Sequence, residues 1–158
     1  MLQERDVQDT LDFTERIGLE SRENLGAKGV TPPFDAGALI VRDGFRFAGT
    51  HLLLDLWNAR WLDDVGGMEK AFRSAVEASD ASLLNLHFHR FGLGGGLSGL
   101  ALLAESHISI HTWPEHSFAA ADIFMCGGAH PYKAARVLRD ALQPEFMLIS
   151  EHRRGVRE

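Results

Sequence analysis

Apolar and polar residues alternate along much of the chain beyond residue 45, and this pattern predicts several short strands. Within 82–91 the apolar residues occupy alternate positions, so one face of a strand is hydrophobic while the other carries His87 and His89. Alternating or continuous apolar stretches predict further strands at 48–57, 97–104, 106–112, 117–126 and 145–152. Apolar residues at helical spacing instead predict helices at 67–79 and 131–142, the second of which begins with a proline.

These elements predict an α+β fold, a two-layer sandwich with a mainly antiparallel sheet and both helices on one face. The predicted order is β-α-β-β-β-α-β, in which 97–112 counts as one strand interrupted at Glu105–Ser106. A chain of this length has few elements left to cover the second sheet face. We therefore expect two copies to pack sheet against sheet, face to face in a dimer.

The first 45 residues follow no such pattern. Residues 5–17 are compatible with a polar helix, and glycine and proline residues interrupt the pattern after it. We interpret 1–45 as an N-terminal arm or extension and 46–158 as the folded domain.

Composition narrows the class of protein. The chain has 158 residues, of which 45% are hydrophobic, a length and composition that fit one folded domain. A net charge of −6 without a cluster of basic residues argues against a nucleic-acid partner. The charged N-terminus is unlike a signal peptide, no apolar stretch has membrane-spanning length, and the single cysteine, Cys126, excludes an intrachain disulfide. We expect a cytoplasmic protein that acts without a membrane partner.

Several residue types suggest chemistry that their spacing does not support. Five of the eight histidines lie within 87–116, and with Cys126 they raise the possibility of a zinc site. However, neither an HExxH nor a CxxC spacing occurs, so hydrogen-bonding or interface histidines are favoured and no metal is expected. A hydrolase triad of Ser106, His111 and Asp122 lacks the G-x-S-x-G turn that exposes such a serine.

Two further features leave alternatives open. The glycine run 92–96 lacks the Lys-Ser/Thr of a phosphate-binding loop and is typical of a hairpin connection, although its amides could lie near a ligand. Cys126 ends an apolar strand before two glycines. It is either a small buried residue or an acid or nucleophile at a strand edge.

One segment is far more specific than these patterns. Residues 104–115, AESHISIHTWPE, resemble the self-processing motif of prokaryotic S-adenosylmethionine decarboxylase proenzymes. Matching segments flank this motif in the expected order, namely GTHLL at 49–53, LDD at 62–64, FH at 88–89, GLSG at 96–99 and AADIFMCG at 120–127. The resemblance covers about residues 46–155, and the arm carries no matching motif.

The resemblance implies a cofactor made from the chain itself. Decarboxylation leaves electrons on the substrate carbon, and a protein-bound pyruvoyl group can accept them. In this family the Ser106 hydroxyl would attack the carbonyl of Glu105 and form an ester. Elimination and hydrolysis would then release ammonia and leave a β-chain of residues 1–105 and an α-chain of residues 106–158. The pyruvoyl group at Ser106 would form a Schiff base with the substrate amine.

The resemblance also assigns roles to five other residues. His111 would be the proton acceptor in autocatalytic cleavage, and Ser98 would support processing through a hydrogen bond. Cys126 would be the proton donor to the substrate carbon after carbon dioxide leaves, because a thiol titrates within reach of neutrality. Glu115 would bind the ribose hydroxyls and Phe91 would stack on adenine.

The implied enzyme is a pyruvoyl-dependent lyase that converts S-adenosylmethionine to its decarboxylated form, the aminopropyl donor of spermidine biosynthesis. The same resemblance implies a homodimer of processed αβ units. A pyruvoyl-dependent arginine or ornithine decarboxylase stays an alternative, because the chemistry requires only an α-amino acid. An unprocessed binding or regulatory homologue is a second alternative, and it predicts an intact chain.

Overall fold

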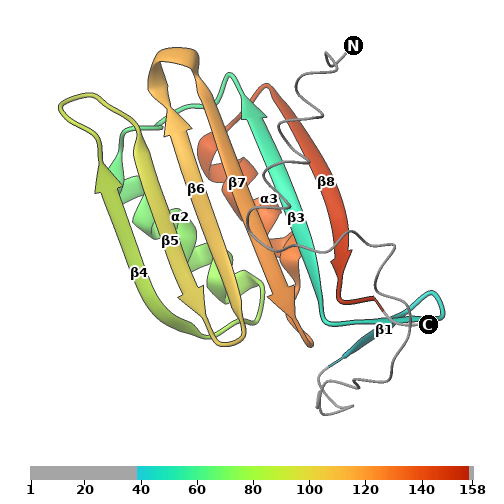
Figure 1. The fold of residues 1–158 in the computed structure, drawn as a ribbon. Coiled ribbons are helices and arrows are strands. Elements are labelled where there is room, and N and C mark those ends of the chain that lie inside the picture. The colour runs from blue at the N-terminus through green and yellow to red at the C-terminus, as the bar shows by residue number, and fades with distance from the viewer. Residues whose placement is uncertain (1–38, 157–158) are drawn as a thin grey trace, which may run out of the picture. The chain divides into compact units, whose positions relative to one another are not determined.

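A six-stranded antiparallel sheet forms the centre of the fold. The computed structural model describes residues 39–156, and its sheet has the strand order β4-β5-β6-β7-β3-β8 (Figure 1). The strands of this sheet are β3 (Gly49–Trp57), β4 (Leu83–Arg90), β5 (Leu97–Leu103), β6 (Ser106–Trp113), β7 (Phe118–Cys126) and β8 (Phe146–Arg154). The remaining elements are the helices α2 (Val65–Ala78) and α3 (Pro131–Leu142), the short helix η2 (Pro114–His116) and the hairpin strands β1 (Ile40–Arg42) and β2 (Phe45–Phe47).

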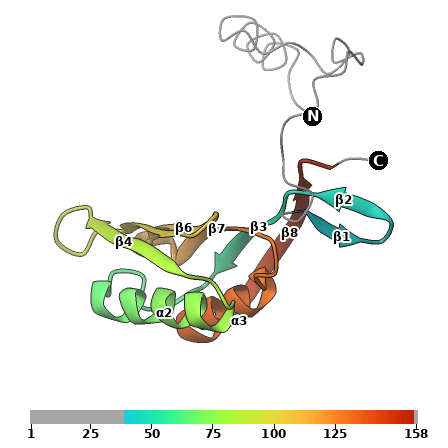
Figure 2. The same ribbon diagram turned by 90° about the horizontal axis from the view of Figure 1, so that it is seen from below.

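The two helices cover the same face of the sheet, which we call the helix face (Figure 2). Alternate residues of each central strand are buried there, as the period of a strand requires. Asp64 caps α2 by accepting a hydrogen bond of 3.0 Å from the Gly67 N–H, and Pro131 begins α3. The predicted α+β class, with an antiparallel sheet and helices on one face, is confirmed. The expected polar helix at 5–17 lies outside the described residues.

One predicted element differs from the structure. The segment 97–112, which the sequence analysis counts as one interrupted strand, forms two antiparallel strands, β5 and β6. Leu103 and Ser106 are register partners, so Ala104 and Glu105 form a two-residue turn that reverses the chain. The interruption at Glu105–Ser106 is therefore the tip of a hairpin.

The opposite face of the sheet, which we call the open face, carries no helix and exposes several large apolar side chains. They come from four strands and are Leu53, Trp57, Leu100, Leu102, Trp113 and Leu148. Three aromatic rings on this face lie in a row across β3, β7 and β6. The ring centroid of Phe118 lies 4.3 Å from that of Trp57 and 5.4 Å from that of Trp113. A folded domain that leaves this much apolar surface uncovered is suited to association through that face.

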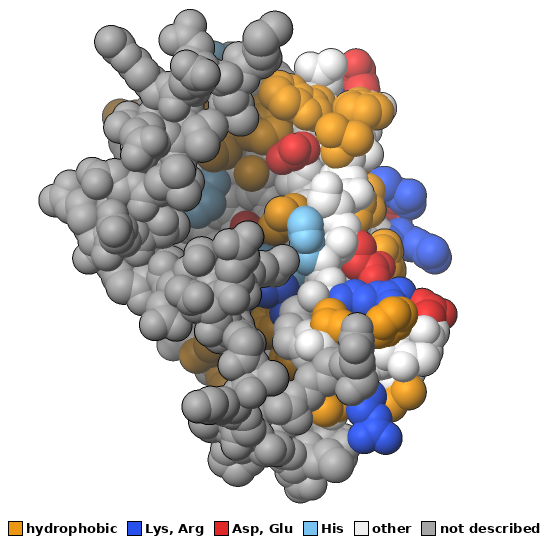
Figure 3. All heavy atoms as spheres, turned by 45° about the vertical axis from the view of Figure 1, so that its right-hand side comes forward, with side chains coloured by type: hydrophobic (Ala, Val, Ile, Leu, Met, Phe, Trp, Pro, Cys, Tyr) orange, Lys and Arg blue, Asp and Glu red, His pale blue; other side chains and the backbone are white. Residues whose placement is uncertain are grey.

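The hairpin β1–β2 packs beside the C-terminal end of β8. The Phe47 side chain is fully buried, and the guanidinium groups of Arg42 and Arg153 lie 5.6 Å and 5.4 Å from its ring. Arg42 also pairs with Glu151, and Arg153 donates to Asp43 at 2.6 Å. Figure 3, which views the protein from the β8 side, shows basic and acidic side chains interspersed there. The sequence pattern did not predict this hairpin, and the division of the chain at residue 45 stays a prediction.

Within residues 39–156, no helix is both long and apolar enough to span a membrane.

Candidate active site

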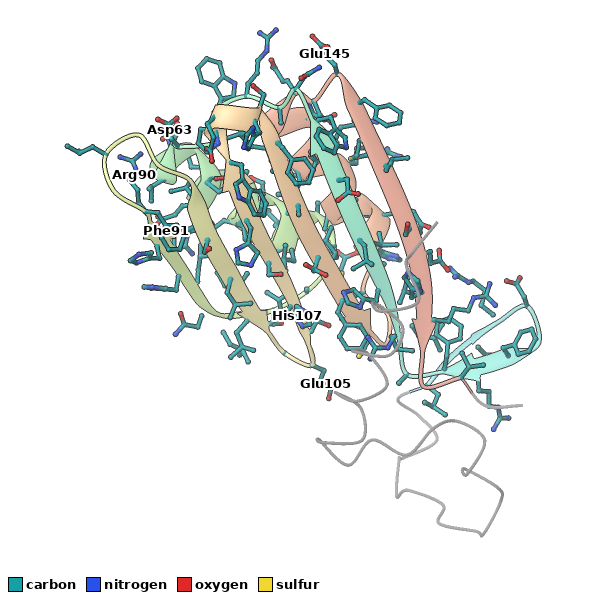
Figure 4. The ribbon with its side chains drawn as sticks, turned by 45° about the horizontal axis from the view of Figure 1, so that its top comes forward. Asp63, Arg90, Phe91, Glu105, His107 and Glu145 are labelled. Carbon is teal, nitrogen blue, oxygen red and sulfur yellow. The ribbon has the colours of Figure 1, made fainter. Side chains whose placement is uncertain are left out.

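The β5–β6 turn holds Ser106, the residue that the motif makes the cofactor precursor. Ser106 is only 8% exposed, and its Oγ accepts a hydrogen bond of 3.2 Å from the backbone N–H of Cys126. Glu105, directly before it, is exposed and has a left-handed backbone with φ of 59°. Figure 4 places Glu105 at the tip of the turn, at the lower end of the sheet. The structure therefore brings three of the predicted site residues together at one end, which we call the Ser106 end.

Cys126 is half-buried at the last position of β7. Burial raises the pKa of its thiol, and the nearby carboxylate of Glu105 raises that pKa further. Both effects oppose the thiolate, so the side chain holds its proton at neutral pH. A protonated thiol can serve as an acid, whereas a nucleophilic cysteine would need a lowered pKa.

Ser98 and His111 form a second group, on the open face and two residues from Trp113 along β6. They are register partners on β5 and β6, and the Oγ of Ser98 lies 2.8 Å from Nδ1 of His111. Their hydrogen bond fixes the orientation of the imidazole ring. It uses the Nδ1 atom, so the Nε2 atom takes no part in it. The sequence predicted both residues, and the structure places them together.

The two groups are separate within one copy of the chain. Ser106 and His111 are five residues apart on β6, an odd spacing that places their side chains on opposite faces of the sheet. Five residues of strand also span roughly 16 Å. A triad of Ser106, His111 and Asp122 is therefore incompatible with the geometry of one chain.

Phe91 and Glu115 lie at the opposite end of the sheet, which we call the Trp113 end. Phe91 follows β4, is 58% exposed and has its ring 4.7 Å from that of His89 (Figure 4). Glu115 lies in η2 and is also exposed. The loop after Phe91 closes with a hydrogen bond from the Phe91 N–H to the Gly96 carbonyl, and Gly96 packs closely against Thr112. Phe91 and Glu115 thus share one end of the sheet, away from Ser106.

The open face also holds a polar cluster that the sequence analysis did not predict. Asp122 lies 3.2 Å from Nε2 of His51 and accepts a hydrogen bond of 3.4 Å from Ser109. Arg154 donates to Nδ1 of His51 at 3.3 Å, so the neutral ring carries its proton on Nε2 and donates it to Asp122.

The neighbour of this cluster is His107, whose ring lies 6.2 Å from that of His51. Burial and His51 lower the pKa of His107, against the opposing effect of Asp122. Asp122 belongs to this cluster rather than to a triad with His111. The strand alternation could have placed His51 and Asp122 on one face, but no sequence pattern shows that β3 pairs with β7.

The sequence pattern had also raised a metal site. In the part of the chain that the structure describes, no group of three or more His, Cys, Asp or Glu side chains has an arrangement suited to a metal ion.

Comparisons with known proteins agree with the motif. A family model described as S-adenosylmethionine decarboxylase matches residues 50–155. The S-adenosylmethionine decarboxylase proenzyme of Thermomicrobium roseum is 40% identical over 109 residues, which cover 68% of this chain and 94% of the relative. That of Methanococcus aeolicus is 43% identical over 110 residues, which cover 68% and 93%. The crystal structure of adenosylmethionine decarboxylase from Aquifex aeolicus matches with a TM-score of 0.64 and 32% identity, covering 71% of this chain and 94% of that one.

Proposed function

The chain belongs to the S-adenosylmethionine decarboxylase family, and from that premise we propose that it cleaves itself at Glu105–Ser106 and decarboxylates S-adenosylmethionine with the resulting pyruvoyl group. The observation that supports this most directly is the position of Ser106. Its hydroxyl is buried directly after the turn, beside the one cysteine of the chain. The decarboxylated product is the aminopropyl donor of spermidine biosynthesis.

The proposed cleavage uses atoms that lie at the turn. The Ser106 Oγ adds to the carbonyl carbon of Glu105, the C–N bond breaks, and the hydroxyl proton ends on the freed amino group. Loss of the Ser106 α-proton then breaks the Cβ–O bond, releases the Glu105 carboxylate and leaves dehydroalanine. Tautomerisation and hydrolysis exchange the amino group for a keto oxygen and release ammonia. No external cofactor or oxidant is required.

The residues at the Ser106 end fit a pyruvoyl group. Ser106 begins a strand, and its Oγ already has a hydrogen-bond donor in the Cys126 N–H. When formed, the group supplies an electrophilic carbonyl that accepts the electrons released with carbon dioxide. The backbone N–H of Cys126 contacts Ser106, and its thiol keeps a proton because burial and the Glu105 carboxylate raise the pKa of that thiol. We assign Cys126 to protonate the substrate carbon.

The separation of His111 from Ser106 supports a dimeric active site. A proton acceptor must come within hydrogen-bond reach of the group that it deprotonates, and the His111 of the same chain lies five residues of strand, roughly 16 Å, from Ser106. We therefore assign this role to the open-face His111 of a second copy, oriented by its own Ser98. The uncovered apolar residues of the open face supply surface for such a dimer.

Glu115 and Phe91 are assigned to the substrate in the same arrangement. Both are exposed at the Trp113 end, remote from the Ser106 of their own chain. A carboxylate can accept hydrogen bonds from ribose hydroxyls, and an aromatic ring can stack on adenine. Their solvent exposure in one copy is the state expected of residues that a second copy and a ligand would cover.

The intact mass of the purified protein under denaturing conditions tests the cleavage. We expect two fragments, 1–105 and 106–158, the second with a blocked N-terminus, and we expect Ser106→Ala to remain whole. Release of carbon dioxide from carboxyl-labelled S-adenosylmethionine, arginine and ornithine then tests the substrate. An intact wild-type chain would contradict the proposed cofactor, and cleaved protein that acts on arginine or ornithine instead would contradict the proposed substrate.

A further inference from the structure

The residue before the scissile bond has an unusual backbone conformation. Glu105 has φ of 59°, in the left-handed region that glycine adopts without strain. For any residue with a side chain, this conformation brings Cβ too close to the residue's own carbonyl oxygen. In Glu105 that carbonyl is the one that Ser106 would attack.

Most other left-handed residues in the described part of the chain have an ordinary explanation. Asparagine and aspartate tolerate the conformation, and the residue after a helix commonly adopts it. These cases are Asp43, Asn58 and Asp80 among the short polar residues, and Ser117 and Gln143 at the ends of η2 and α3. Only Trp61 and Glu105 fall outside both groups among residues 39–156. Glutamate is thus not a residue that the turn itself selects.

Contacts on both sides hold Glu105 in this conformation. The Ala104 N–H donates to the Ser82 carbonyl at 2.9 Å, which fixes the turn on one side. On the other side β5 and β6 pair immediately, and the Cys126 N–H holds the Ser106 Oγ at 3.2 Å. A strained conformation persists only where its surroundings enforce it in this way, and such sites are commonly functional.

We propose that the left-handed backbone of Glu105 promotes self-cleavage, because formation of the ester relieves the crowding at its carbonyl group. In this step the Ser106 Oγ bonds to the Glu105 carbonyl carbon, the C–N bond breaks and the hydroxyl proton passes to the nitrogen. The acyl group then leaves the backbone path that enforces its conformation. The inference rests on the proposed function and adds that the turn, besides the proton acceptor, sets the rate of processing.

Substitutions at one position separate the backbone from the carboxylate. Glu105→Gly removes both the carboxylate and the crowded Cβ, whereas Glu105→Ala removes only the carboxylate and retains the Cβ. The fraction of cleaved chain is followed over time after synthesis in a cell-free translation system. We expect Glu105→Gly to cleave about five- to thirtyfold more slowly than Glu105→Ala, the range that relief of left-handed strain allows. Glu105→Asn, which tolerates the conformation, is expected to fall between them.

Stability provides the matching control. In the uncleavable Ser106→Ala background, the added Glu105→Gly change is expected to unfold at a temperature no lower than that with Glu105→Ala. Slower cleavage in a fold of equal or greater stability is a result that a merely structural role of Glu105 would not produce.

Two outcomes would overturn the inference: equal cleavage rates for the glycine and alanine variants, whether or not both are slower than Glu105→Gln and the wild type, or a less stable glycine variant. Neither of these is the result that refutes the proposed function, which is a wild-type chain that stays uncleaved.

Discussion

The Oγ of Ser98 lies 2.8 Å from Nδ1 of His111 on the open face, whereas the Ser106 that this histidine is assigned to activate begins the same strand five residues earlier. Five residues of strand, roughly 16 Å, keep the His111 of one chain from its own Ser106. A second copy is the source of a proton acceptor that the proposed function requires.

Complementation between two inactive variants tests this shared site. Ser106→Ala and His111→Ala chains, distinguished by tags and each expressed alone, are expected to stay uncleaved. When the two are coexpressed, the His111→Ala chain keeps its serine and receives the histidine of its partner. We expect cleavage of the His111→Ala chain alone, detected by its tag, in up to half of the molecules. An uncleaved His111→Ala chain in a purified mixed dimer would show that the histidine acts within its own chain.

The apolar open face predicts how the dimer can be broken. Leu102 is 48% exposed on this face in a single copy, so Leu102→Glu leaves the fold of that copy intact but places a charge in the proposed interface. We expect sedimentation velocity to show a monomer, and cleavage to fail with it. The matched control is Val41→Glu, which puts the same charge on a side chain that is 70% exposed on the β1–β2 hairpin. If Leu102→Glu remains dimeric, the copies associate through another surface.

Periodicity predicted the elements of this fold better than their arrangement. The helix at 67–79 is found as α2, and the strand at 48–57 as β3, because burial on one face repeats along each segment. The position of β3 between β7 and β8 follows from pairings across about 70 to 100 residues, such as His51 with Phe124 and His51 with His152. No local pattern records such pairings, and the His51–Asp122 contact depends on them.

The motif predicted the site residues, and the structure adds how they are divided. Nothing in the motif places Cys126 beside Ser106, because twenty residues separate them and only the pairing of β6 with β7 brings them together. The odd spacing from Ser106 to His111 was visible in the sequence, yet its consequence depends on 106–113 being one regular strand. The left-handed conformation of Glu105 has no sequence signal, since a glutamate does not favour it.

Asp122 allows the discarded triad to be tested directly. Its carboxylate contacts His51 and Ser109 rather than His111, so Asp122→Asn should leave cleavage intact. The amide still accepts one hydrogen bond, and loss of the other interaction on this part-exposed group is expected to lower the free energy of unfolding by about 1 kcal/mol. Intact mass measures the cleavage, and urea denaturation in the Ser106→Ala background measures the stability. Loss of cleavage without loss of stability would place Asp122 in the processing machinery.

Cys126 should be separable from processing, because its backbone N–H rather than its thiol contacts Ser106. Cys126→Ala retains that N–H and is expected to cleave normally. Removing the proposed proton donor should nevertheless reduce kcat by about 10²- to 10⁴-fold, the usual contribution of a general acid. Mass spectrometry of the variant confirms the cleavage, and labelled carbon dioxide measures kcat. Near-normal kcat in a cleaved Cys126→Ala protein would remove Cys126 from the proposed mechanism.

The same thiol predicts the alkaline limit of the reaction. Cys126 acts in its protonated form, and both burial and the Glu105 carboxylate raise its pKa above the ordinary value for a thiol. Activity should therefore persist through neutral pH and fall only as the pH rises through this raised pKa. Glu105→Gln removes a negative charge that disfavours the thiolate, so the pKa falls and the alkaline limb of kcat moves to lower pH. The profile is measured on fully cleaved protein, with Glu145→Gln, a carboxylate at the other end of the sheet, as the control (Figure 4). An alkaline limb that stays in place in Glu105→Gln would show that Glu105 does not act on the proton that Cys126 donates.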